Sequence, residues 1–430
     1  MAKTKHNQNK DLQDVKMNRI TENKSSKSAN PENPTSDKWE IPSDWEVMQL
    51  GKIAKVTSGG TPSRENKSYW GGNIPWITTS LIDFNEIVNA IEFITNEGLK
   101  NSSTKLFSSG TLLMALYGQG ITRGKTAILK IEAATNQACA AIILDEKKAN
   151  RHFVFQYLIN KYEDIRKLSN TGNQENLNGE LVKSIKINLP PLPEQIAIAQ
   201  LLSTWDNAIT KTQALIAQKE QRKKWLMQNL LTGKMRLKGF GNTKWKKVGA
   251  GEIFESFTKK GFENEELLSA TQDRGIIPRS QLEGRVTMPE GTTAGYKLVE
   301  PGDFIISLRS FQGGLEYSYF RGIVSPAYIV LKPKEKIEVE FYKQYYKSYE
   351  FIGRLATAVI GIRDGKQVSY DDFCIVKIPF PSIEEQTAIS QVLQAADKEI
   401  QLLKRKCDKL KEQKKGLMQV LLTGKKRLII

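Results

Sequence analysis

Few segments of the sequence combine residue types that could carry out catalysis. Residues 188–191 read Asn-Leu-Pro-Pro, which is close to the Asn-Pro-Pro-Tyr motif of enzymes that methylate amino groups. A leucine interrupts the motif, no aromatic residue follows the prolines, and the related segment 379–382 reads Pro-Phe-Pro-Ser. Both segments are better explained as entries into helices. No glycine-rich fingerprint for S-adenosylmethionine follows an early strand.

A glycine-rich segment at 118–126 could instead bind phosphate. It reads Gly-Gln-Gly-Ile-Thr-Arg-Gly-Lys-Thr. For an ATP-binding loop, however, the stretch that ends at the Gly-Lys pair is too long if it starts at Gly118 and too short if it starts at Gly120. The related loop 309–314, Arg-Ser-Phe-Gln-Gly-Gly, has no lysine. We therefore expect these loops to contact the phosphates of nucleic acid and not those of ATP.

Histidine and cysteine are scarce. The chain has two histidines, His6 and His152, and three cysteines, Cys139, Cys374 and Cys407. This set excludes a disulfide framework, a Cys/His zinc cluster and a Ser-His-Asp triad. No two carboxylates and a lysine occur at the spacing along the sequence that is typical of a nuclease active site. We therefore predict that the chain is not an enzyme by itself and binds no metal or cofactor.

The chain is strongly basic. Its 430 residues include 64 Lys and Arg against 47 Asp and Glu, a formal net charge of +17. Such a charge favours a polyanionic partner, most often nucleic acid. No apolar run approaches the length of a membrane span and the N-terminus lacks a secretory signal, so we expect a cytoplasmic protein. Residues 1–38, rich in Asn, Lys and Ser, are predicted to form a disordered basic tail.

An internal repeat organises the sequence. Residues 187–237 align without a gap on 378–428, at an offset of 191, with 22 identities in 51 positions. The ends match best: 226–234 reads Leu-Met-Gln-Asn-Leu-Leu-Thr-Gly-Lys, and 417–425 reads Leu-Met-Gln-Val-Leu-Leu-Thr-Gly-Lys. The chain is therefore a duplication.

Each copy of the repeat predicts a long helix. Mostly apolar residues recur at alternating steps of four and three through 198–230 and 389–421. This spacing is that of the positions along which the helices of a coiled coil meet, here called the seam. Gly233 and Gly424 suit the left-handed position after a helix end.

The two helices are predicted to pair with each other, antiparallel. A chain that leaves the first helix, forms a domain and returns could lay the second helix beside the first. Lys219, Lys223 and Lys414 lie on the seam and are expected to weaken the pairing, to snorkel or to face a partner. Cys407, also on the seam, is expected to be a small buried hydrophobe.

The segments between the helices are related more faintly. The apolar run 110–116 resembles 302–308, and a glycine-rich loop follows each run. Each segment then shows a short helical stretch, a polar loop and a final strand. We predict an α+β fold with two mixed α/β domains, two long helices and an internal pseudo-two-fold repeat. The expected order is tail 1–38, domain 39–186, helix 187–237, domain 238–377 and helix 378–430.

The doubled segment resembles the specificity subunit of Type I restriction–modification systems. The matching residues are 190–195, Pro-Pro-Leu-Pro-Glu-Gln, and 381–386, Pro-Ser-Ile-Glu-Glu-Gln, each of which precedes a long helix and follows a variable domain. The resemblance covers about 39–430. It implies two target recognition domains, each reading one half of a split, asymmetric DNA site, and two paired helices that set the distance between the half-sites.

The resemblance also implies partners. The helices would dock two methyltransferase (M) subunits, which bind S-adenosylmethionine and methylate adenine at N6 after flipping the base from the duplex. A restriction and motor (R) subunit would join for cleavage, with ATP and Mg. This chain would bind double-stranded DNA, none of these cofactors and no membrane.

Polar residues in the loops are the candidates for contacts with DNA bases, because Arg pairs with guanine and Gln or Asn pairs with adenine. In the first domain the candidates are Gln119, Thr122, Arg123, Lys125, Asn173, Gln174 and Asn176. In the second domain they are Arg309, Ser310, Gln312, Gly313, Arg363, Lys366 and Gln367. Arg64 and Arg274, in early polar loops, are secondary candidates. The alternative for each is an ordinary solvated loop residue.

Two other functions stay open from the residues alone. A DNA-binding coiled-coil scaffold without a methyltransferase partner would bind DNA without any modified sequence. A nuclease with an unrecognised site would cut DNA by itself. The basic segments 222–224, 404–406 and 425–427 could contact phosphates, dock an acidic methyltransferase surface or face solvent.

Overall fold

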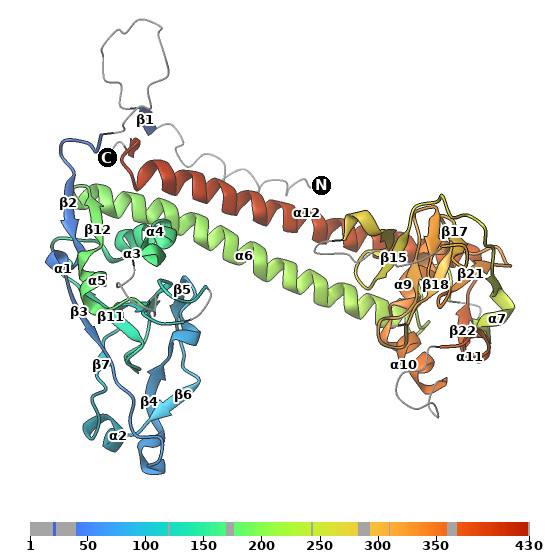
Figure 1. Cartoon of the computed structure of the whole chain (residues 1–430), viewed down its shortest axis with the longest axis horizontal. Coiled ribbons are helices and arrows are strands. Elements are labelled where there is room, and N and C mark those ends of the chain that lie inside the picture. Colours follow the sequence, from blue (N-terminus) through green and yellow to red (C-terminus); the bar gives the residue numbers. More distant parts are fainter. Residues whose placement is uncertain are drawn as a thin grey trace, which may run out of the picture. The chain divides into compact units, whose positions relative to one another are not determined.

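Two compact units make up the chain in the computed structural model (Figure 1). The structure describes residues 20–22, 40–118, 121–168, 176–241, 244–282, 293–308, 310–358 and 368–428. The first unit comprises Met1–Lys211 and Cys407–Ile430, and the second comprises Thr212–Lys406, so each long helix contributes to both. Within these described ranges, no helix has the length and apolar character needed to cross a membrane.

The first unit is built on two sheets. The larger has the order β3-β11-β8-β9-β5 and is antiparallel except for the parallel pair of β5 and β9. Its strands are β3 (Ala54–Ser58), β11 (Cys139–Leu144), β8 (Leu112–Ala115), β9 (Thr126–Leu129) and β5 (Asn85–Ile87). The smaller has the order β6 (Glu92–Ile94), β4 (Trp70–Ile77), β10 (Ala133–Thr135) and β7 (Leu106–Phe107).

Strand β8 shows how this unit is packed. Successive side chains of a strand point to opposite faces. Leu112 and Met114 therefore join one core with Phe153 of α3 (Arg151–Asn160), whereas Leu113 and Ala115 join another with Phe107. All four β8 residues are buried, so the strand reads as a continuous apolar run and not as an alternating one.

Short helices complete the first unit. The helical stretch predicted before the polar loop is confirmed as α3 (Arg151–Asn160) and α4 (Tyr162–Lys167). The other short helices are α1 (Leu50–Ile53), α2 (Asn96–Lys100) and α5 (Gly179–Ser184). Strand β12 (Lys186–Leu189) pairs with β2 (Glu46–Gln49) and leads directly into the first long helix.

Three residues of the tail 1–38, which the sequence predicts to be disordered, form a strand in the structure. Ile20–Glu22 forms strand β1, which pairs antiparallel with β23 (Lys426–Leu428). The rest of 1–38 lies outside the described residues.

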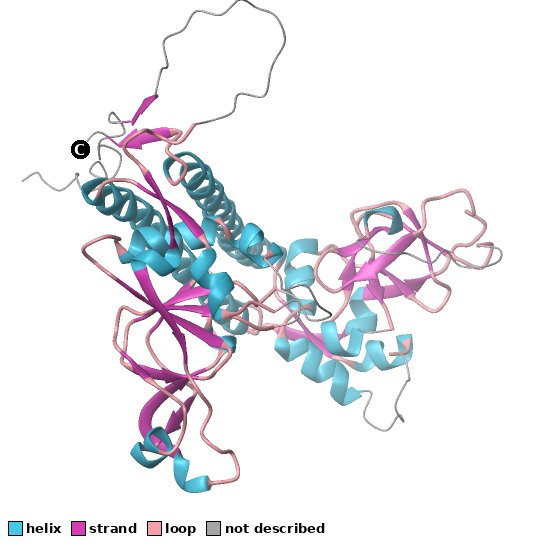
Figure 2. Ribbon diagram, turned by 60° about the vertical axis from the view of Figure 1, so that its left-hand side comes forward, coloured by secondary structure: helices cyan, strands magenta, loops and turns pink. Residues whose placement is uncertain are grey.

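The second unit contains a four-stranded antiparallel sheet in the order β14-β21-β18-β19. Its strands are β14 (Phe254–Phe257), β21 (Ile329–Pro333), β18 (Phe304–Ile306) and β19 (Glu316–Tyr317). Three two-stranded pairs accompany it: β15 (Leu268–Thr271) with β16 (Gly275–Pro278), β17 (Lys297–Val299) with β20 (Gly322–Val324), and β13 (Lys246–Gly249) with β22 (Lys377–Phe380). Strands and helices thus mix in each unit, as predicted (Figure 2).

Aromatic side chains fill the core of the second unit. Phe254 lies 5.6 Å from Phe304 and 5.5 Å from Tyr342, between ring centroids, in edge-to-face geometry. The helices that cover this core are α9 (Val339–Tyr346), α10 (Tyr349–Ala358) and α11 (Tyr370–Ile375), with the shorter α7 (Ala250–Ile253) and α8 (Ser310–Gly313).

The long helices α6 (Leu192–Leu230) and α12 (Ile383–Leu421) run antiparallel, as predicted. In the first unit, Leu202 of α6 shares a core with Leu421 of α12. In the second, Leu230 shares a core with Ile389. Gly233 and Gly424 follow the helix ends with φ of 72° and 76°, which confirms the left-handed position expected of them.

Each of the three seam lysines faces a carboxylate partner on the opposite helix. Lys219 pairs with Glu399 at 2.6 Å and Lys223 with Asp397 at 2.6 Å in the second unit. Lys414 pairs with Asp206 at 2.7 Å in the first. Cys407 is 3% exposed, so its prediction as a buried hydrophobe is confirmed.

Candidate nucleic-acid interface

Nine of the sixteen candidate residues fall within the described ranges. The other seven lie outside them: Gln119, Asn173, Gln174, Arg309, Arg363, Lys366 and Gln367. Asn176 is described and is half-buried just after one of these gaps.

A tight turn between β8 and β9 carries Thr122, Arg123 and Lys125. The amide of Lys125 donates to the carbonyl of Thr122 at 3.0 Å, and Gly124 has a φ of 84°. Only a residue without a Cβ adopts that conformation freely, so glycine permits the turn. Residues 122–125 of the phosphate-loop pattern seen in the sequence therefore form a turn.

Arg123, which is predicted to contact a base, does not project from this turn. Its side chain is 9% exposed, and its Nη2 donates to the carbonyl of Arg166 on α4 at 2.9 Å. A buried guanidinium that satisfies a backbone carbonyl fixes the turn against α4. Arg123 is thus a positioning residue in this structure.

Lys125 is also engaged with the protein. Its Nζ lies 2.6 Å from Oδ1 of Asp83 and 5.8 Å from the centroid of the Phe84 ring. Phe84 has a φ of 53°, and it is the one non-glycine residue in the described ranges with a positive φ. Such a conformation persists only where neighbours hold it. Here the Tyr162 ring packs on Phe84, with the two centroids 5.0 Å apart.

Exposed apolar side chains border the same turn and were missed from the sequence. Ile121 is 65% exposed and Tyr117 is 41% exposed, although both follow a buried strand. The carbonyl of Ile121 accepts a hydrogen bond from the Tyr162 hydroxyl, so the loop is held while its side chain faces solvent. The available signal was an apolar and an aromatic residue within a glycine-rich loop.

Arg64 is bound by its own domain. It forms two hydrogen bonds with Glu92, at 2.5 and 3.0 Å, and its guanidinium lies 3.7 Å from the centroid of the Trp70 ring. The pair raises the pKa of Arg64 and lowers that of Glu92, because each charge stabilises the other. A base contact by Arg64 would have to break this pair.

In the second unit, Arg274 lies at the tip of the β15–β16 hairpin. Its side chain is 46% exposed and approaches the carboxylate of the adjacent Asp273 only to 3.9 Å. Gln312 of α8 is also exposed. Ser310, by contrast, is fully buried, and its Oγ accepts a hydrogen bond from the amide of Ser307 at 2.8 Å.

Lys347 brings these two groups of candidates together. Its Nζ donates to the carbonyl of Gly313 at 3.0 Å and to that of Gln272, in the Arg274 hairpin, at 3.4 Å. It also pairs with Glu316 at 2.7 Å. Burial raises the pKa of Glu316, and Lys347 opposes that shift. A side chain at Gly313 would meet the Gln272 amide at 3.0 Å, so the two loops are in close contact.

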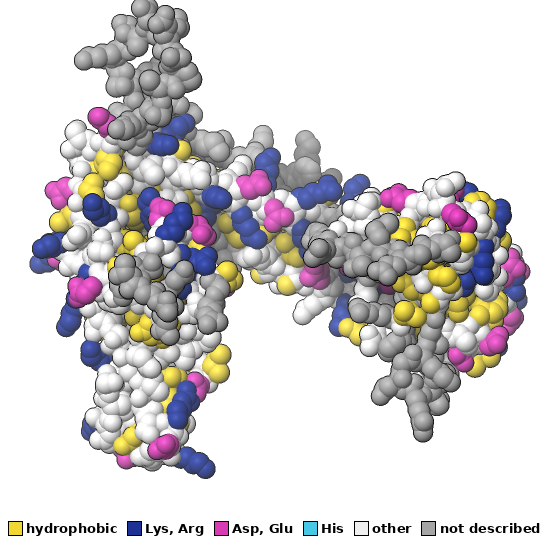
Figure 3. All heavy atoms as spheres, viewed as in Figure 1, with side chains coloured by type: hydrophobic (Ala, Val, Ile, Leu, Met, Phe, Trp, Pro, Cys, Tyr) yellow, Lys and Arg dark blue, Asp and Glu magenta, His cyan; other side chains and the backbone are white. Residues whose placement is uncertain are grey.

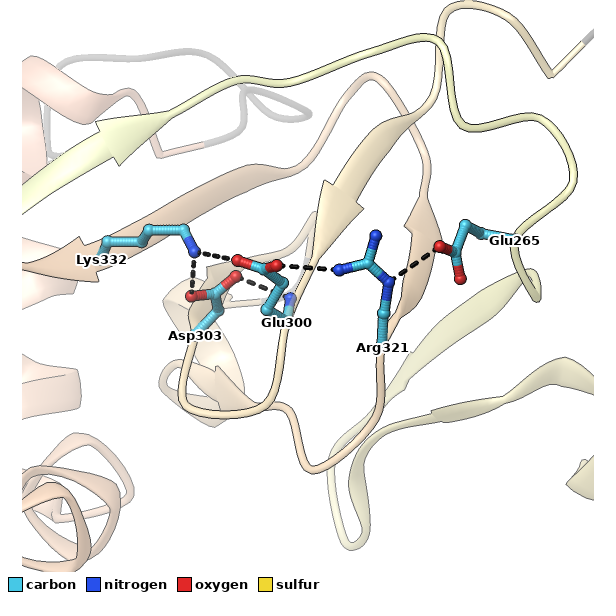
Figure 4. A network of polar contacts seen from close by, with 5 residues as sticks. All are labelled: Glu265, Glu300, Asp303, Arg321 and Lys332. Carbon is cyan, nitrogen blue, oxygen red and sulfur yellow. Dashed lines mark hydrogen bonds and ion pairs between the residues drawn. The ribbon is translucent and has the colours of Figure 1, made fainter.

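One carboxylate–lysine cluster in the second unit could suggest a nuclease, but its charges are mutually satisfied (Figure 4). Lys332 lies 2.6 Å from Glu300 and 3.4 Å from Asp303, and Glu300 also pairs with Arg321 at 2.9 Å. Asp303 accepts from the amide of Glu300 at 2.8 Å. Burial raises the pKa of Asp303, whereas the hydrogen bond from Lys332 lowers that of Glu300. The cluster therefore closes the turn between β17 and β18.

The visible surface carries mixed charge. Lys and Arg side chains are interspersed with Asp and Glu over the face drawn in Figure 3. This distribution agrees with local basic loops and clefts as sites for nucleic acid, and not with one broad basic field.

A buried glutamate anchors the first unit to its long helix. Glu194, 1% exposed, accepts from Nη2 of Arg427 at 2.6 Å and from the indole of Trp45 at 3.2 Å. The next residue, Gln195, accepts from the amide of Asn150 at 2.7 Å. Hydrogen bonds of Glu194 at the start of α6 thus connect Trp45, which precedes β2, with Arg427, which follows α12.

The second unit repeats this anchor. Glu385, 2% exposed, accepts from Nη2 of Arg236 at 2.6 Å and from the indole of Trp245 at 2.8 Å. Gln386 accepts from the amide of Glu338 at 2.8 Å. The Glu-Gln pair of the repeat therefore has a definite structural role, which is to fasten each domain to a helix.

Comparison with known proteins agrees with this duplicated construction. The family described as Type I restriction modification DNA specificity domain matches residues 42–220 and again 242–412. The MjaX specificity subunit of a type I restriction enzyme from Methanocaldococcus jannaschii is 29% identical over 421 residues, which cover 90% of this chain and 95% of that protein.

Solved structures share the fold. The HsdS subunit from Thermoanaerobacter tengcongensis matches with a TM-score of 0.51 at 19% identity, over 90% of this chain and 99% of that one. The S subunit of a Type I restriction-modification system from M. genitalium matches with a TM-score of 0.54 at 16% identity, over 89% and 97%. Because the family's sequence model covers most of the chain in two copies, the chain belongs to the Type I restriction modification DNA specificity family.

Proposed function

We propose that this chain directs a Type I restriction–modification complex to a bipartite, asymmetric DNA site. Residues 39–186 and 238–377 would be the two target recognition domains, and each would read one half of the site. Segments 187–237 and 378–430 would be the spacer helices. The chain would supply recognition and geometry, and its partner subunits would supply the chemistry, in the cytoplasm where the DNA lies.

The repeated anchor is the observation that carries this proposal. Glu194 and Glu385 occupy equivalent places in the repeat and bind equivalent Trp and Arg side chains. A duplicated anchor that holds two different domains is what a two-part reader requires. Each domain can then vary its loops without changing the helix to which it is attached.

The loops at equivalent places support an asymmetric site. In the first unit, the described part of the segment after β8 includes a turn that carries Thr122 and Lys125. In the second, the segment after β18 includes the short helix α8, with Gln312 exposed. Because the two surfaces present different donors and acceptors, they would recognise different base sequences.

The paired helices would set the distance between half-sites and dock two methyltransferase subunits. Leu215 on α6, which is 38% exposed, is available for such contacts. The methyltransferase would bind S-adenosylmethionine and flip the target adenine. The motor subunit would join this complex for cleavage, with ATP and Mg.

A methylation map tests the proposal. The chain is co-expressed with the methyltransferase encoded beside it, in a host that lacks adenine methylation, and modified bases are read by single-molecule sequencing. We expect a split motif with a fixed gap. No modified motif, with both proteins soluble and co-purifying, would favour the scaffold function. DNA cutting by the purified chain alone would favour a nuclease.

A further inference from the structure

A basic cleft of about 1020 Å³ lies in the second unit, between the distal part of α6 and the start of α10. Lys224 and Trp225 line it from α6, and Tyr349 lines it from α10. Lys234 and Lys247 line it from the segment that follows α6.

The lining carries more positive than negative charge. Six cationic side chains and two glutamates face the cleft. Both glutamates are already neutralised, because Glu220 pairs with Lys404 at 2.7 Å and Glu350 with Arg354 at 2.8 Å. The carboxylates of the cleft therefore do not compensate its other cations.

Three lysines are left to attract an anion. Lys224, Lys234 and Lys247 are exposed, and none forms an ion pair with another residue in the described part of the chain. The Nζ of Lys224 lies 4.7 Å from the centroid of the Tyr349 ring, which faces solvent at 67% exposure. Lysines interleaved with exposed aromatic rings are typical of surfaces that bind nucleic acid.

Lys347 connects the cleft to the candidate reading loops. It lines the cleft, and its Nζ bonds to the carbonyls of Gly313 and Gln272, beside Gln312 and Arg274. A duplex whose bases meet those loops would continue along a surface that carries unpaired lysines. An acidic protein segment could satisfy the same charges, but this continuity favours DNA.

We propose that this cleft binds the sugar–phosphate backbone of the DNA next to the half-site read by the second unit. The proposal rests on the DNA-recognition function proposed above and adds a phosphate-binding site outside the base-reading loops. Lys224, Lys234 and Lys247 contact phosphates, and Trp225 and Tyr349 pack against the adjoining sugars.

The site belongs to one half of the molecule only. At the repeat offset, Lys224 corresponds to Lys415, but Trp225 corresponds to Gly416. Lys247 corresponds to Val47 in the matching strand. The matching positions of the first unit thus lack the tryptophan and the third lysine, so the DNA is held more firmly on one side of the split site.

The test uses the complex of the full chain with its methyltransferase subunits and a duplex that contains the mapped motif. The triple substitution Lys224→Gln, Lys234→Gln and Lys247→Gln removes three phosphate contacts. Between 50 and 200 mM NaCl, we expect the Kd of the variant to rise about 40-fold less than that of the wild type, as three fewer released counterions require. The methylated motif stays the same, and the hydroxyl-radical footprint shortens on one side only.

A matched control replaces three exposed lysines that do not line the cleft: Lys238→Gln, Lys244→Gln and Lys246→Gln. It should keep the wild-type salt dependence and footprint. Unchanged salt dependence in the cleft variant would refute the proposal. Loss of methyltransferase co-purification would also refute it, because it would identify an acidic protein as the occupant of the cleft. The wild-type methylation map judges the proposed function separately, since it does not depend on the cleft.

Discussion

Lys414 of α12 lies 2.7 Å from Asp206 of α6, and the repeat places the same pair in the other unit as Lys223 and Asp397, at 2.6 Å. Each aspartate is 191 residues from its counterpart, and so is each lysine. A single ancestral pair therefore appears twice. In each unit it joins the two helices at a polar position within a mostly apolar seam.

Each of these aspartates also receives a hydrogen bond from a recognition domain. Gln156 of α3 donates to Asp206 at 2.6 Å, and Gln344 of α9 donates to Asp397 at 3.0 Å. The aspartate thus fixes the register of the helices and the attachment of the domain at the same point. Polar seam residues commonly specify register at a cost in stability.

Lys414→Ala should lower the free energy of unfolding by about 1 kcal/mol. Lys414 is mostly buried, and its removal leaves Gln156 as the remaining side chain that bonds to Asp206. Lys404→Ala is the matched control, since its pair with Glu220 is exposed on both sides, and it should change stability by less than about 0.5 kcal/mol. Urea denaturation followed by circular dichroism measures both. Equal effects would mean that Lys414 has no special role in the pairing.

Glu194→Gln should destabilise the first unit by about 3 kcal/mol, because it leaves the Arg427 guanidinium without one of its carboxylates in a buried anchor. Glu385→Gln should do the same to the second unit through Arg236. Glu180→Gln, which removes an exposed pair with Lys183, is the control and should be near neutral. Thermal unfolding would contradict the anchor model if the three variants behaved alike.

Cys139 should resist alkylation at pH 8. Burial raises the pKa of its thiol to about 12, so almost no thiolate forms, and the residue is fully buried in β11. Cys374 is only half-buried and should react first with iodoacetamide. Mass spectrometry of the modified peptides measures the order. Early modification of Cys139 in the native protein would show that β11 opens readily.

Arg274→Ala should weaken recognition of one half-site only, by about 1–3 kcal/mol, as expected for a base-edge contact. Binding to duplexes with either half-site scrambled measures the effect. Lys334→Ala, an exposed residue beyond β21, is the control and should leave both half-sites unaffected. If Arg274→Ala relaxed both half-sites equally, two independent readers would not be the correct description.

The helices were predictable from the sequence because periodicity and repetition determine them directly. The cross-helix pairs were not, since Asp206 and Asp397 look like surface residues until the antiparallel register brings a lysine to each. A seam lysine therefore looks destabilising in the sequence only because the residue opposite it is not yet known.

The candidate reading residues were harder to predict, because residue type does not reveal which way a loop side chain points. Arg123 and Ser310 have the right donors but turn inward to satisfy backbone groups. Arg274 is 46% exposed at a hairpin tip, although its Nη1 also donates to the carbonyl of Gln281 at 3.4 Å. Gln272, which is exposed beside Arg274 in the same polar turn, is not among the candidates. Only the fold distinguishes these cases.

Lengthening both helices by one turn should lengthen the tolerated gap between half-sites. Four residues inserted after Ala214 in α6, with four after Arg405 in α12, keep Lys219 opposite Glu399 and Lys414 opposite Asp206. The added rise is about 6 Å, or roughly two base pairs of duplex. An insertion in α6 alone misaligns these pairs and should reduce stability as well. Methylation mapping reads the gap directly, and an unchanged gap in the stable double insertion would show that the helices do not measure the DNA.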